Sequence, residues 1–99
     1  MVLGHEACGA VKSACDDVKL GNITHLLSNI KPAVEATSCT GERNSKNSDF
    51  VADVVTNNVK LTVDRIREKS EVLKEMEDNG EIKIVGAVYS ITSGKVTLI

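Results

Sequence analysis

The fold is decided at the start of the chain by the stretch MVLGHEACGAVKSAC (residues 1–15). Its apolar opening, residues 1–3, predicts the end of a strand, and residues 8–15 predict a helix with Gly9 near its start. Gly4 and Gly9 flank the junction, and glycine accepts the backbone angles that a sharp turn needs. The stretch therefore predicts a strand, a tight turn and a helix, with His5 and Cys8 held at the turn.

His5 and Cys8 are the chemically distinctive residues of this stretch. An imidazole and a thiolate separated by two residues can both reach one zinc ion if the backbone turns between them. A catalytic zinc ion usually has three protein ligands and a water, so the pair predicts only part of a metal site. A His-x-x-Cys pair also arises by chance, so the spacing alone leaves both a zinc site and an ordinary turn open.

The size of the chain limits how many domains it can form and how much surface it can bury. It has 99 residues, 41% of them apolar, and no Pro-rich or Ser-rich linker divides it. We therefore expect a single domain over residues 1–99. Because a short chain buries a smaller fraction of its surface on folding than a long one, we also expect a homo-oligomer, a dimer or larger, whose partner covers apolar faces.

Charge and cysteine content exclude several classes of function. Twelve basic and fourteen acidic residues give a net charge of −2 without a basic block, so we expect no nucleic-acid partner. The apolar runs are far shorter than the roughly 20 residues that span a bilayer, and no basic region precedes an apolar run at the start, so we expect no membrane association and no export. Three cysteines form no disulfide framework, which favours a reducing compartment, the cytoplasm.

Two short helices and a loop are predicted after residue 15. One helix is expected to start with Asn22 as its N-cap. Its apolar face consists of Ile23, Leu26, Leu27 and Ile30. Pro32 then permits only a new first turn. Residues 37–47 are polar without apolar periodicity and predict a loop.

A long amphipathic helix is predicted from Ser48 onward, because apolar residues recur there at steps of three and four. They are Phe50, Val51, Val54, Val55, Val59, Val63 and Ile66. Ser70 predicts the cap of a following short helix, which Asn79-Gly80 ends. The residues expected to face inward are Leu73 and Met76.

The last part of the chain predicts a β-hairpin. Residues 82–91 form a β-branched run, Ser93-Gly94 supplies a turn, and residues 95–99 alternate as a second strand. No internal repeat or low-complexity segment indicates a solenoid or a disordered tail.

Several segments, taken in order along the chain, resemble those of the β-class carbonic anhydrases. The first is VLGHEACGAV (residues 2–11), which is similar to the second zinc motif of that family. The others are IKPAV (residues 30–34), Asn58-Val59, Ser70 before a short helix, IVGAVY (residues 84–89) and TSGKV (residues 92–96). The chain is therefore similar to the C-terminal half of a β-carbonic anhydrase over almost its whole length.

This resemblance implies both a function and a fold. The function is that of a zinc enzyme, a lyase that interconverts carbon dioxide and bicarbonate with zinc-bound hydroxide as the nucleophile. His5 and Cys8 would be two of the Zn²⁺ ligands, and Gly9 would lie against the substrate. The fold is α/β: a truncated parallel sheet with flanking helices and a C-terminal antiparallel hairpin.

The sequence departs from the family in one respect. The family's first motif, Cys-x-Asp-x-Arg, supplies a third zinc ligand, and it does not occur here. Cys15 precedes two aspartates but no arginine at the needed spacing, so Cys15 is predicted to be a buried apolar residue and Cys39 a loop thiol.

Two hypotheses of function follow from this departure. The chain is either a carbonic anhydrase completed by another polypeptide segment, or a catalytically inactive remnant that acts as a zinc-binding or self-associating module. In the second case two copies, related by a two-fold axis, can combine His5 and Cys8 into a closed site of two histidines and two cysteines.

Overall fold

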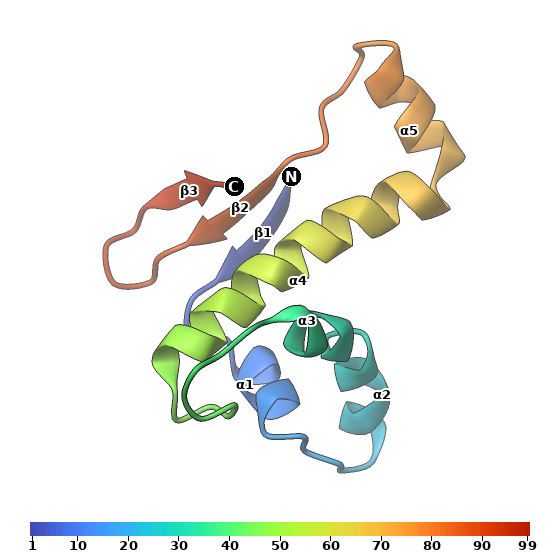
Figure 1. Cartoon of the computed structure of the whole chain (residues 1–99). Helices are drawn as coiled ribbons and strands as arrows, with labels where there is room; N and C mark the ends of the chain where they lie inside the picture. Colours follow the sequence, from blue (N-terminus) through green and yellow to red (C-terminus); the bar gives the residue numbers. More distant parts are fainter.

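Three strands form one mixed sheet in the order β1–β2–β3 (Figure 1). The structure is a computed structural model that describes residues 1–99. Strand β1 spans Val2–His5, β2 spans Gly86–Tyr89 and β3 spans Val96–Leu98. β1 is parallel to β2, with His5 opposite Tyr89, and β2 is antiparallel to β3. The two ends of the chain therefore meet in one sheet, and the predicted C-terminal hairpin is confirmed.

The long helix α4 (Ser48–Lys69) lies across β1 and β2 and is the only helix that contacts the sheet (Figure 1). Asn47 caps it, because its side-chain oxygen accepts a hydrogen bond from the Phe50 backbone N–H at 3.3 Å. The predicted apolar face is buried at Phe50, Val51, Val54, Val55, Val59 and Val63. This helix therefore carries most of the core.

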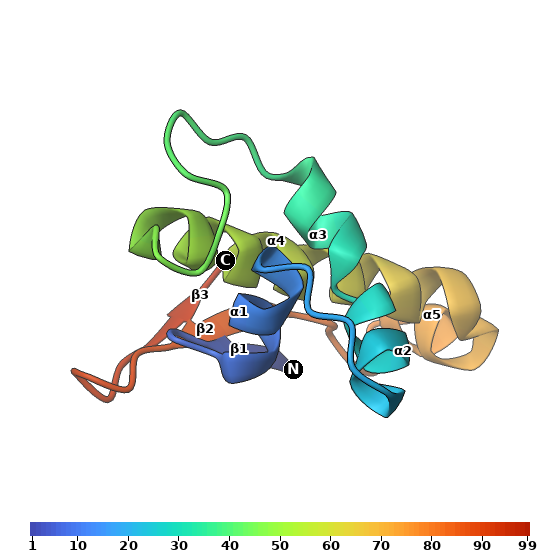
Figure 2. The same ribbon diagram turned by 90° about the horizontal axis from the view of Figure 1, so that it is seen from below.

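Three short helices lie together beside α4: α1 (Gly9–Cys15), α2 (Asn22–Ser28) and α3 (Lys31–Ala36). Seen from below, α1 lies in front of the strands (Figure 2). α1 and α3 contact α4, and α2 contacts both of them. The residues that they bury are Val11, Ala14, Cys15, Leu27 and Ala33. The last helix, α5 (Glu71–Asp78), follows α4 directly and buries no residue.

Two glycines allow α4 to lie close to the sheet. A Cβ atom on Gly4 of β1 would stand 2.7 Å from Cγ2 of Val59, and one on Gly86 of β2 would stand 2.7 Å from Cγ1 of the same valine. Real Cβ atoms do not approach so closely, so a side chain at either position would push the helix away. Val59 therefore fits against both neighbouring strands, because neither strand has a side chain at that point.

An ion pair fixes the chain as it approaches β2. Arg67 of α4 donates from Nε to Oε1 of Glu77 at 2.8 Å and from Nη2 to Oε2 at 3.1 Å, so the salt bridge is bidentate. The same two side chains hold Ile84, whose carbonyl accepts from Arg67 and whose N–H donates to Glu77. The pair therefore ties α4, α5 and the segment before β2 together.

Several sequence expectations need correction in the first half of the chain. Asn22 is the first residue of α2, and Gly21 with φ of +54° is the N-cap. Of the apolar face expected there, Leu27 is buried and Ile30 is half-buried. Ile23 and Leu26 are exposed by 43% and 55%, because α2 packs only on α1 and α3 at the edge of the molecule.

The second half holds further differences. Ser70 caps α5 as predicted, with its Oγ accepting from the Leu73 N–H at 3.3 Å, but Leu73 is 40% exposed and Met76 is only half-buried. The β-branched run contributes only Gly86–Tyr89 to the sheet as a strand. Just before it, the Val85 carbonyl accepts from the Val2 N–H at 2.8 Å, whereas Ile84 is held by Arg67 and Glu77. The hairpin connection extends from Ser90 to Lys95, longer than the predicted two-residue turn.

The face of the sheet opposite α4 has no helix on it. Side chains alternate along a strand, so the neighbours of Gly4 and Gly86 point to this second face. Leu3, Val96 and Leu98 lie there with 53%, 51% and 65% of their surface exposed. Parallel strands normally occur in sheets that are covered on both faces. The sheet therefore presents an apolar surface that a further layer would bury.

We expect Gly4→Ala to lower the free energy of unfolding by about 1–3 kcal/mol, because the new methyl group overlaps Val59 in a packed interface. Urea unfolding measures the change. Gly9→Ala is the matched control, since a Cβ there would meet no atom within 4 Å and an effect below about 0.5 kcal/mol is expected. Equal losses in the two variants would contradict the packing argument.

The ion pair predicts a pH dependence of stability. Arg67, followed by the Ile84 N–H, lowers the pKa of Glu77 from 4.5 to about 2. A carboxyl whose pKa is lower in the folded chain stabilises it fully above the unfolded pKa, and this stabilisation is lost as the pH falls from 4.5 toward 2.

We therefore expect the difference in unfolding free energy between the chain and its Glu77→Gln variant to narrow between about pH 5 and pH 2. Urea unfolding at a series of pH values measures it. Glu35→Gln, on the short helix α3 and remote from the ion pair, serves as the control and should show no such narrowing. A difference that stays constant down to about pH 2 would contradict the assignment.

Candidate metal centre

His5 and Cys8 lie on the two sides of one tight turn. His5 is the last residue of β1, and Cys8 is the N-cap of α1 with φ of −65° and ψ of 122°. The backbone reverses at Ala7, whose φ of +54° is rare for a residue other than glycine. The expectation that Gly4 and Gly9 make the turn is therefore wrong: Gly4 packs under Val59, and Gly9 is the first residue of the helix.

The His5 ring is oriented by the backbone of the next residue. Its Nδ1 lies 2.9 Å from the carbonyl oxygen of Glu6. Because a carbonyl oxygen can only accept, the proton of this bond belongs to Nδ1, and in the neutral ring the lone pair is on Nε2. Metal-binding histidines commonly use this arrangement, in which one nitrogen donates to the protein and the other faces the ion. His5 itself is exposed.

Cys8 is half-buried, and its side chain packs against the core cluster that includes Val11 and Val51. Its thiol makes no hydrogen bond to the first turn of α1. Gly9, beside it, is exposed, and a Cβ there would meet nothing within 4 Å. The thiol is thus held by packing, with open space next to it.

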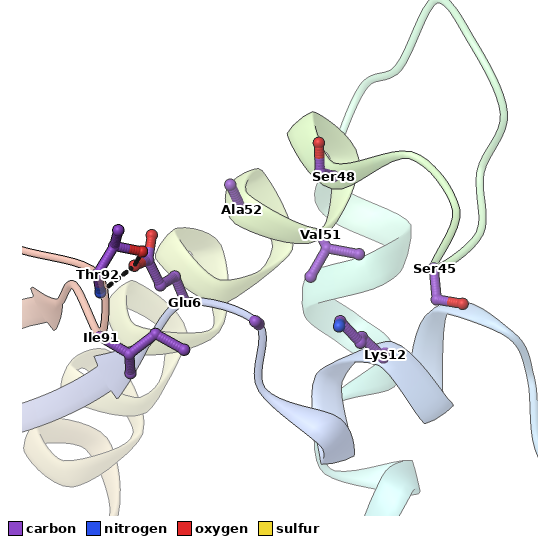
Figure 3. A pocket seen from close by; sticks show the side chains of 9 residues that line it. Glu6, Lys12, Ser45, Ser48, Val51, Ala52, Ile91 and Thr92 are labelled. Atoms are coloured by element: carbon purple, nitrogen blue, oxygen red, sulfur yellow. Dashed lines mark hydrogen bonds between the residues drawn. The ribbon is translucent and has the colours of Figure 1, made fainter.

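Glu6 is a residue that the sequence interpretation missed. Its Oε1 accepts from Ser90 Oγ at 2.8 Å. It also accepts from the Thr92 N–H at 3.1 Å and from Thr92 Oγ1 at 2.9 Å (Figure 3). These bonds, first of all that from Ser90, hold the pKa of Glu6 below its usual value. The only sequence signal was a carboxylate between two candidate metal ligands, and its partners lie more than eighty residues away.

A cavity of about 300 Å³ lies beside the turn (Figure 3). It is bounded by Glu6 and Ala7, by Lys12 of α1, by the start of α4, and by Ile91 and Thr92 of the hairpin connection. Neither His5 nor Cys8 lines it. The cavity therefore borders the turn at Glu6 and Ala7 without including either candidate ligand.

His5 and Cys8 are the right types of side chain for zinc, but two side chains are too few for a complete site. Imidazole and thiolate are ordinary zinc ligands, but no group of three or more histidine, cysteine, aspartate or glutamate side chains forms a possible metal site. Cys15 is buried in the core, and Cys39 is a half-buried loop thiol that accepts from Asn47 Nδ2 at 3.2 Å, as both were predicted to be. His25 is exposed on α2. These residues by themselves therefore do not complete a zinc site.

Comparisons with known proteins agree with the resemblance seen in the sequence. The family model described as carbonic anhydrase matches residues 1–96. No sequence among the curated proteins matches the chain.

Solved structures of fungal β-carbonic anhydrases share the fold. CafA of Aspergillus fumigatus superposes with a TM-score of 0.75 at 23% identity, over 98% of this chain and 46% of that one. A tetrameric enzyme of Sordaria macrospora gives 0.72 at 17%, over 98% and 49%. CafD of Aspergillus fumigatus gives 0.64 at 15%, over 98% and 54%. The chain thus spans about half the length of these proteins.

The three cysteines are expected to differ in reactivity. Burial, followed by the charge of Asp16, raises the pKa of the Cys15 thiol, and the side chain is only 7% exposed. Since the thiolate is the reactive form, iodoacetamide should modify Cys15 more slowly than Cys8 or Cys39 in the folded chain. Peptide mass spectrometry measures the three rates, and the rates in urea supply the control. A Cys15 that reacts as fast as Cys8 before unfolding would contradict the burial.

Proposed function

The chain belongs to the β-carbonic anhydrase family, and from this premise we propose that it takes part in the zinc-dependent, reversible hydration of carbon dioxide to bicarbonate. The supporting observation is the turn that carries His5 with its Nε2 free and Cys8 three residues later. His5 and Cys8 are proposed as two ligands of Zn²⁺, and Gly9 as the residue against the substrate.

Each residue of the turn has a separate task in this proposal. When bound, a zinc ion lowers the pKa of its water ligand from about 15.7 to about 7, which makes a nucleophile available at neutral pH. His5 binds through Nε2 while Nδ1 donates to the Glu6 carbonyl. Cys8 binds through its thiolate, and its packing against the core limits its movement. Gly9 leaves room for a small substrate because it has no side chain.

The third ligand is proposed to come from another polypeptide segment. The outer edge of β1 pairs with no strand, and the face opposite α4 is apolar and uncovered. Both features lie next to His5, which ends β1. A segment that extends the sheet beyond β1 would bring side chains close to the metal-binding turn. Activity therefore depends on that segment as well as on this chain.

Self-association and location are further parts of the proposal. One similar solved structure is tetrameric, and Leu3, Val96 and Leu98 offer apolar surface for contact, so we infer a homo-oligomer built from single domains of residues 1–99. No helix is both long and apolar enough to cross a membrane. The odd number of cysteines, all of them free, supports a reducing compartment, and we propose the cytoplasm.

The test is zinc stoichiometry by elemental analysis, together with solution mass and a carbon dioxide hydration assay. It is made on the chain alone and on the chain with any polypeptide that co-purifies with it, here called the partner. His5→Ala and Cys8→Ala should each lower zinc affinity by more than the roughly 10- to 100-fold typical for loss of a ligand's hydrogen-bond partner. They should abolish hydration as well. His25→Ala and Cys39→Ser are the matched controls and should keep both properties.

Two outcomes would decide against the enzyme. Full zinc content in either ligand variant would overturn the assignment of that ligand. Zinc bound without hydration, in a dimer and in the presence of the partner, would favour the alternative: an inactive zinc-binding or self-associating module.

A further inference from the structure

Glu6 connects three parts of the molecule through three different groups. Its N–H donates to the Tyr89 carbonyl at 3.1 Å, which continues the β1–β2 ladder beyond His5. Its carboxylate accepts from Ser90 in the connection between β2 and β3. It also accepts from Thr92 of the same connection (Figure 3). Its carbonyl oxygen accepts from His5 Nδ1. One residue thus joins the hairpin to the imidazole.

The hairpin connection that holds the carboxylate is itself closed by hydrogen bonds. The Ser90 N–H donates to the Lys95 carbonyl at 2.8 Å, and the Gly94 N–H donates to the Ser90 carbonyl at 2.8 Å. Ser90 Oγ also accepts from the Ser93 N–H at 3.2 Å while it donates to Glu6. The carboxylate is therefore bound to an ordered loop, through bonds that its charge strengthens.

The turn after Glu6 needs such an anchor. Ala7 has a φ of +54°, a conformation that is unfavourable for a residue with a side chain and persists only when the surroundings fix it. The Glu6 carboxylate is fixed on one side of this residue, and Cys8 is packed on the other. Release of the carboxylate would let the backbone relax and carry the Glu6 carbonyl away from His5.

We infer that Glu6 is a positioning residue for His5. By anchoring the turn to the β2–β3 connection, it keeps its own carbonyl beside the imidazole and holds the ring in the Nδ1–H form, with Nε2 presented to a ligand. This inference rests on the proposed role of His5 as a metal ligand, but it concerns the metal-free chain and can be tested there.

The experiment measures the tautomer of His5 by long-range proton–nitrogen NMR on the full, metal-free chain at neutral to mildly basic pH. The chain should show the Nδ1–H form. In Glu6→Ala the signal should shift toward the mixture of tautomers of a free imidazole, and zinc affinity should fall about 10- to 100-fold. Glu6→Gln keeps an acceptor oxygen for Thr92 and should restore most of the Nδ1–H signal. Glu81→Ala, at an exposed position far along the chain, is the control and should change neither quantity.

A second variant keeps the test decisive if Glu6→Ala does not fold. Thr92→Val removes one of the three donors to the carboxylate and leaves the backbone N–H, so it should produce a smaller shift in the same direction.

The outcomes separate positioning from simple stabilisation and from metal binding. A lower melting temperature with an unchanged His5 tautomer in Glu6→Ala, or the same tautomer in all variants, would overturn the inference. A tautomer that shifts in Glu6→Ala while neither protein binds zinc would support it and would count against the proposed function alone. A shift together with weaker zinc binding would support both.

Discussion

The contact of Val59 with Gly4 and Gly86 is the constraint on which the rest of the structure depends. One side chain of α4 fits over two neighbouring strands that come from opposite ends of the chain. Because both strands lack a Cβ at this point, the helix lies flat against β1 and β2 together. This contact keeps the end of β1, where His5 and Cys8 lie, beside the end of β2, where the hairpin begins.

Two polar contacts act at the two ends of β2. Arg67 and Glu77 hold Ile84 just before the strand, and Glu6 holds Ser90 and Thr92 just after it. Apolar packing resists separation of helix and sheet but is not directional, whereas hydrogen bonds require fixed partners. The polar contacts therefore complement Val59 by setting the register of β2 against β1, and with it the place of the loop against the turn that carries His5 and Cys8.

The incomplete ligand set and the uncovered sheet face are related features. The turn at the end of β1 supplies an imidazole and a thiolate, one ligand fewer than a catalytic zinc ion uses. The same strand has a free edge, and Leu3 beside it is exposed on the face away from α4. The two candidate ligands and the uncovered apolar surface thus lie close together on β1, and the chain spans about half the length of the similar solved structures.

The sequence by itself determined the local features. The apolar period of α4, the Ser70 cap, the hairpin and the His5–Cys8 spacing each depend on residues a few positions apart, so propensity and spacing were enough to predict them. The tertiary structure alone decided that Gly4 packs under Val59, that Ala7 makes the turn, that β2 is short, and that Glu6 anchors the site. These features depend on which strands pair and which helix covers them, and such contacts between distant residues leave no periodic signal in the sequence.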